Sequence, residues 1–130
     1  MKIRINNQSI RLRLSQSEVA AIAQGLRLCQ KLQLGKNQVF SYELIPSEFT
    51  KLPKATFISQ KLEVHLPIHR AVAWAKTNEV SLHHVQDKGT DLECTILIEK
   101  DFQCLHQRHD EDESDNFPNP NSLEDNQNFV

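Results

Sequence analysis

The chain has 130 residues, a formal net charge of −2, 38% hydrophobic residues and three cysteines. This size predicts one domain with a modest core, and three cysteines are too few for a disulfide-stabilised secreted scaffold. No run of eighteen apolar residues could cross a membrane and no continuous apolar segment near residue 1 resembles a signal peptide, so we expect a cytoplasmic protein without membrane association.

The first fourteen residues predict a β-hairpin, with two alternating runs joined by the turn-prone residues 6–9. Period-two alternation puts isoleucine and leucine on one face and the cations on the other. The cations, which are our candidates for anion binding, are Lys2, Arg4, Arg11 and Arg13. Because like charges opposite one another are unfavourable, we expect this face to meet internal glutamates, an acidic segment or a small anion.

Two helices and further strands follow. Ser15 and Glu18 fit a capping box, which predicts a helix over about 16–24 that ends near Gly25. Pro67 can open a second short helix over about 68–76. Strand patterns occupy residues 26–34, 39–45, 56–66, 80–85 and 92–99. The sequence therefore predicts an α+β fold, an antiparallel meander sheet of five to seven strands with the first helix packed on it. No internal repeat is apparent.

The charges divide the chain. All fifteen Lys and Arg lie at or before Arg108, whereas seven of the seventeen acids lie in the last 22 residues. We therefore predict a single domain over 1–108 and an acidic, largely disordered tail over 109–130. Phe117 and Pro118 are the candidates to anchor this tail on a surface, and the basic hairpin face is its charge complement.

Few residues point to catalysis or to a cofactor. Cys104, His106 and His109 are weak candidates for metal ligands, because their spacing is not a standard zinc pattern. The chain lacks a nucleophile elbow and a glycine-rich phosphate loop, so we expect no cofactor and favour a protein that is not an enzyme. Nucleic acid is not an expected partner, because the aromatic residues fall mainly on core positions.

Three segments carry a family resemblance: K-I-R-I-x4-I-R-L-R-L-S-Q-S-E-V from Lys2, L-I-E-K-D-F-x-C-L from Leu97, and E-D-E-x-D-x-F-P-N-P from Glu111. Together they resemble a family of small bacterial proteins of unknown function. The resemblance implies no activity. It implies that the tail motif belongs with the domain, and that Phe102, Cys104 and Arg108 form one folded junction.

Two functions are compatible with these patterns. The first is a non-catalytic interaction or regulatory module that binds an unknown protein partner or forms a homodimer through an exposed strand edge. The second is a binder of, or an enzyme acting on, an anionic or phosphorylated small molecule at the basic sheet face. Pairing of the hairpin cations with glutamates or with the tail would favour the first. Unpaired cations around a concave pocket would favour the second.

Overall fold

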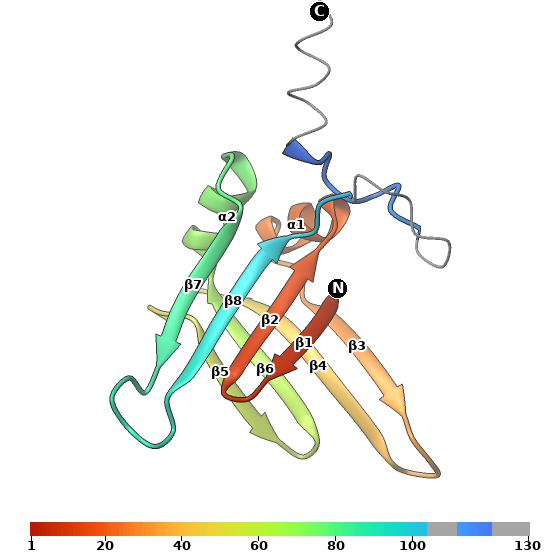
Figure 1. Ribbon diagram of the computed structural model, residues 1–130, viewed down its shortest axis with the longest axis vertical. Coiled ribbons are helices and arrows are strands. Elements are labelled where there is room, and N and C mark those ends of the chain that lie inside the picture. Colours follow the sequence, from red (N-terminus) through yellow and green to blue (C-terminus); the bar gives the residue numbers. More distant parts are fainter. Residues whose placement is uncertain (104–111, 121–130) are drawn as a thin grey trace, which may run out of the picture.

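The computed structural model describes residues 1–103 and 112–120, which form an α+β fold with two helices and two four-stranded sheets (Figure 1). The first sheet has the strand order β1-β2-β8-β7 and the second has the order β3-β4-β6-β5. The elements are β1 (Lys2–Asn6), β2 (Ser9–Leu14), α1 (Gln16–Ala23), β3 (Leu28–Gln33), β4 (Val39–Ser47), β5 (Lys54–Ile58), β6 (Lys61–Pro67), α2 (Ile68–Lys76), β7 (Ser81–Gln86) and β8 (Cys94–Lys100).

The α+β class and both helices are confirmed, but the single meander of five to seven strands is wrong. Eight strands form two sheets, and each sheet is joined at its centre by a parallel pair, β2 with β8 and β4 with β6. One predicted strand, 56–66, is in fact the β5–β6 hairpin. Ser59 and Gln60 make its turn with φ angles of 54° and 64°, a conformation that residues other than glycine rarely adopt.

The structure reveals an internal duplication that the sequence did not show. β1, β2 and α1 begin at residues 2, 9 and 16, and β5, β6 and α2 begin at residues 54, 61 and 68, each 52 positions further on. The order strand–strand–helix–strand–strand thus occurs twice. Equivalent backbone bonds support it, since Thr95 N donates to Gln8 O at 2.9 Å and Ser41 N donates to Gln60 O at 3.2 Å. Each sheet takes one hairpin from each half, so the strand orders β1-β2-β8-β7 and β5-β6-β4-β3 are equivalent.

The helices lie together at one end of the two sheets and pack against each other (Figure 1). Each contributes two buried side chains, Val19 and Ile22 from α1 and Ala71 and Trp74 from α2. The indole of Trp74 donates to Val80 O at 3.1 Å, which satisfies its only polar atom inside the core. The strands supply the rest of the buried core, namely Ile10, Leu12, Leu14, Leu44, Leu62, Val64, Leu66, Leu82, Ile96 and Ile98.

The starts of the two helices differ. Ser15 N donates to Glu18 Oε1 at 3.0 Å, as the capping box predicts. Pro67 precedes α2 with a φ of −55° and lacks a side chain that could cap it. Neither described helix is long and apolar enough to cross a membrane.

Candidate functional site

The four hairpin cations lie on the outer face of the first sheet, with Lys2 opposite Arg13 and Arg4 opposite Arg11. Glu99, on the neighbouring strand β8, accepts a hydrogen bond from Arg13 Nε at 2.8 Å and pairs with Arg11 Nε at 3.4 Å. Lys2 Nζ lies 3.1 Å from Asp101 Oδ2. Arg4 makes no ion pair with any described residue. Internal carboxylates therefore neutralise three of the four cations.

The second sheet has a matching arrangement on its outer face. Glu43, on the central strand β4, pairs with Arg27 at 2.8 Å and with Lys61 at 3.6 Å, and its side chain is 10% exposed. Burial alone would raise the pKa of Glu43, but hydrogen bonds from Cys29 and Arg27, together with the charge of Lys61, lower it below its usual value. Both outer faces thus place one glutamate of a central strand between two cations.

Phe117 lies against the end of the first sheet. Its ring centroid is 5.8 Å from that of Phe102, and Lys100 Nζ lies 5.5 Å from the Phe117 ring centroid. Backbone bonds fix this position, because Phe117 N donates to Asp101 O at 2.8 Å and Gln103 N donates to Phe117 O at 2.7 Å. Phe117 is partly buried, whereas Pro118 is exposed.

The same segment reaches the first turn of α1. Gln16 N donates to Asp115 O at 2.9 Å, and the Ser17 hydroxyl donates to the Asp115 carboxylate. The hydrogen bond from Ser17 is the main cause that lowers the pKa of Asp115. Residues 112–120 therefore lie at the start of α1 and the end of β8, and this part of the predicted tail has a defined position.

Cys104, His106 and His109, the weak metal candidates, lie outside the described residues, as do Arg108 and the predicted boundary between domain and tail. Residues 1–103 and 112–120 contain no group of three or more His, Cys, Asp or Glu that could hold a metal ion.

β3 is the edge strand of the second sheet, and five of its six residues are exposed. Leu28 and Leu32 of β3 lie on the face that carries the core, but only Leu28 packs against it. Leu26, Leu32 and Leu34 are 55%, 52% and 72% exposed. The sequence did contain these residues, since Leu32 and Leu34 end the predicted strand over 26–34. An exposed strand and a covered strand have the same alternating pattern, so the sequence could not show that this one is exposed.

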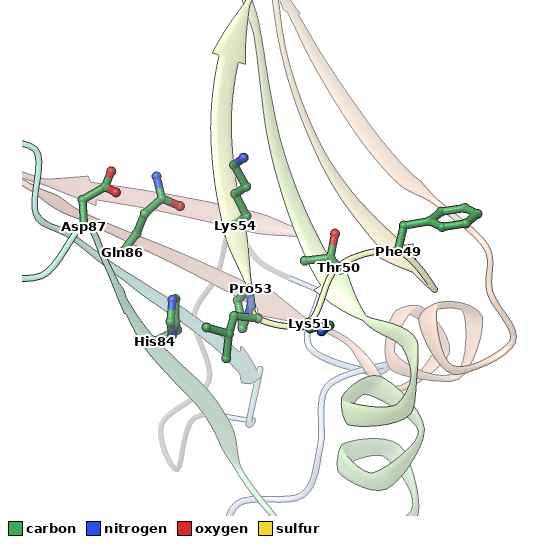
Figure 2. Close-up of a pocket in the computed structure, with 9 residues that line it drawn as sticks. Phe49, Thr50, Lys51, Pro53, Lys54, His84, Gln86 and Asp87 are labelled. Carbon is green, nitrogen blue, oxygen red and sulfur yellow. The ribbon is translucent and has the colours of Figure 1, made fainter.

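A hollow of about 480 Å³ opens between β7 and the segment that leads into β5 (Figure 2). His84, Gln86 and Asp87 line it from the β7 side. Lys51, Pro53 and Lys54 are among the residues that line it from the other side. The sequence analysis did not find this site, because its two sides are about thirty residues apart and meet only through the packing of the two sheets.

These features define a class of protein: an α+β domain built from a duplicated strand–strand–helix–strand–strand unit, with a bare edge strand and neutralised outer faces. The chain belongs to the Family of unknown function (DUF7009), whose model matches residues 1–121. The resemblance to a family of unknown function is thereby confirmed. Searches of curated proteins and of solved structures found no match for the chain.

Proposed function

We propose that this protein is a non-catalytic cytoplasmic interaction module that works as a homodimer joined through β3. The observation that carries the proposal is the exposure of five of the six β3 residues in a strand at the edge of its sheet. An exposed edge strand with apolar side chains offers both unpaired backbone groups and apolar area to another strand.

The backbone of β3 has a defined set of free groups. Leu34 N donates to Gln38 O at 2.9 Å, which closes the β3–β4 hairpin. Hydrogen-bonded pairs alternate along an antiparallel ladder, so Leu32 and every second residue before it bond to β4. The intervening residues, Cys29, Lys31 and Gln33, therefore direct their N–H and C=O groups toward the open edge.

A second copy of β3 fits this edge in a register that avoids like charges. Antiparallel pairing about a two-fold axis at Gln30 sets Cys29 opposite Lys31 and Leu28 opposite Leu32, so that outward-directed backbone groups bond one another. Pairing about Lys31 instead would set two lysines directly opposite each other, which is unfavourable. A single lysine on an edge also disfavours indiscriminate pairing with other strands. Here it disfavours the register that is centred on Lys31.

The competing function, binding of an anionic or phosphorylated molecule on the basic hairpin face, has weaker support. Glu99 and Asp101 already pair with Arg11, Arg13 and Lys2. To contact most of the cations on this face, an anionic ligand would have to displace the carboxylates that already pair with them.

Light scattering coupled to size exclusion tests the proposal. The wild-type chain should have the mass of a dimer at high micromolar concentration. Gln30→Glu should produce monomer, because it sets two carboxylates opposite each other at the axis. Gln38→Glu makes the same charge change in the hairpin turn and should leave the dimer intact. Circular dichroism checks that both variants fold. A monomeric wild type, or a Gln30→Glu variant that remains dimeric, would refute the proposal.

A further inference from the structure

The hollow between β7 and the start of β5 has two fixed sides. The Gln86 side chain accepts a hydrogen bond from Ala55 N at 2.7 Å and donates to Ala55 O at 3.0 Å. This amide ties the edge of the second sheet to the edge of the first, so the two sides are held at a set separation. A volume of about 480 Å³ lies within the range of small-molecule sites.

The charges around this hollow differ from those on the two outer faces. Lys51 and Lys54 form no ion pair with any described residue, although eight ion pairs occur elsewhere among the described groups or at the N-terminus. His84 adds an imidazole from the β7 side, and Asp87 supplies the one carboxylate of the lining. Figure 2 shows the Lys54 side chain across the hollow from Gln86 and Asp87.

Each group has a preferred ligand chemistry. Two ammonium groups and an imidazole suit the oxygens of a phosphate, through charge-assisted hydrogen bonds. A carboxylate at the rim suits an ammonium group on the same ligand, and it disfavours a bare anion by like-charge repulsion. A purely anionic ligand would leave Asp87 unmatched, whereas a ligand with both charges matches both sides.

We propose that this hollow binds a small phosphomonoester that also carries an amine. Lys51, Lys54 and His84 hold the phosphate, and Asp87 holds the ammonium group. The site is separate from the β3 interface, so it stands whether or not the protein dimerises.

Nuclear magnetic resonance titration of the full-length chain tests this inference, with phosphoethanolamine and inorganic phosphate as probes. Phosphoethanolamine should shift the amide signals of residues 50–52, 54 and 84–87 in a saturable manner and should bind more tightly than phosphate. The double variant Lys51→Ala/Lys54→Ala should weaken both probes at least about tenfold, the loss of about 1.4 kcal/mol. Asp87→Asn should remove the preference for phosphoethanolamine while phosphate binds as well or better.

A charge-matched control separates a site from a general effect of net charge. Arg4→Ala/Lys36→Ala removes two exposed cations that have no ion pair with described residues, and it should leave both titrations unchanged. Absence of saturable shifts would overturn the inference. So would equal weakening by the two double variants, or a preference for phosphoethanolamine that survives in Asp87→Asn.

Discussion

β3 and β7 hold equivalent places in the two halves, yet one is bare and the other covered. Leu28 of β3 pairs with Leu44, and Leu82 of β7 pairs with Ile98, at the same point of each sheet. Leu82 is 3% exposed, whereas most of β3 faces water. β7 lies beside the start of β5, to which Gln86 binds, and β3 has no such neighbour among the described residues. The two halves thus have the same strand order, but the β7 edge is covered and the β3 edge is exposed.

The largest expected effect tests this contrast at its equivalent leucines. Leu82→Ala should lower the free energy of unfolding by about 2–5 kcal/mol, because it leaves a cavity in the core. Leu28→Ala, at a partly buried position, should cost only about 1 kcal/mol. Urea denaturation at low protein concentration measures both. Equal costs would mean that β3 is covered as well as β7 is.

The second test concerns the end of β8, where residues 112–120 pack against the first sheet. Phe117→Ala should cost about 1–3 kcal/mol, because it removes the ring contacts with Phe102 and Lys100. The adjacent Pro118 is exposed, so Pro118→Ala should change stability by less than about 0.5 kcal/mol. Thermal unfolding of the two variants gives the comparison. If both variants have the melting temperature of the wild type, the contact of Phe117 does not stabilise the domain.

The third effect concerns the link that closes the β7 edge. Gln86→Ala removes two hydrogen bonds to Ala55, each worth about 0.5–1.5 kcal/mol, and should speed hydrogen exchange at the Ala55 amide. Gln33→Ala on the bare strand β3 serves as the matched control and should have little effect on the monomer. Unchanged exchange at Ala55 would show that the edge of β5 is protected by other groups.

The smallest expected effect compares the first turns of the helices, where α1 has Glu18 and α2 has Arg70 as its third residue. Burial alone would raise the pKa of Glu18, but hydrogen bonds from the N-terminal ammonium and Ser15 lower it below its usual value. The pKa of Glu18 is lower in the folded state than in the unfolded state. Glu18 therefore stabilises the protein at any pH above its unfolded-state pKa, and this contribution is lost as the pH falls through the folded-state pKa.

Stability measured by urea denaturation between about pH 6 and pH 3 should therefore fall more steeply for the wild type than for Glu18→Gln. Arg70→Gln should change the slope less than Glu18→Gln does, since it removes only the exposed Arg70–Glu79 ion pair at 2.9 Å. Identical slopes for Glu18→Gln and the wild type would rule out the proposed linkage.

Local signals in the sequence predicted local structure well. The alternation before and after residues 6–9 gave the first hairpin and its two faces, and the capping box and Pro67 gave the starts of both helices. The β5–β6 turn was missed because Ser59 and Gln60 are not typical residues for a turn with positive φ angles. The arrangement of the strands in two sheets was missed for another reason. A period-two pattern shows which side chains of a strand share a face. It carries no information about which other strand pairs with that strand.

The duplication escaped notice because the halves share apolar positions more than residue identities. Val19 and Ile22 correspond to Ala71 and Trp74, side chains of different volume that fill one core together. The candidate sites depended on the same missing information. The sequence led us to expect internal glutamates opposite the hairpin cations, but the pairing of β2 with β8 was needed to place Glu99 beside Arg11 and Arg13.

The crossing of strands between halves has a consequence for how the chain acquires its structure. Residues 1–47 contain both hairpins of the first half, but each hairpin finds its central neighbour, β8 or β6, only in residues that are synthesised later. A nascent first half therefore has no complete sheet of its own, and the leucines of β2 and β4 stay unprotected until the second half has left the ribosome. Separate expression of the two halves should yield unstructured fragments that assemble when mixed.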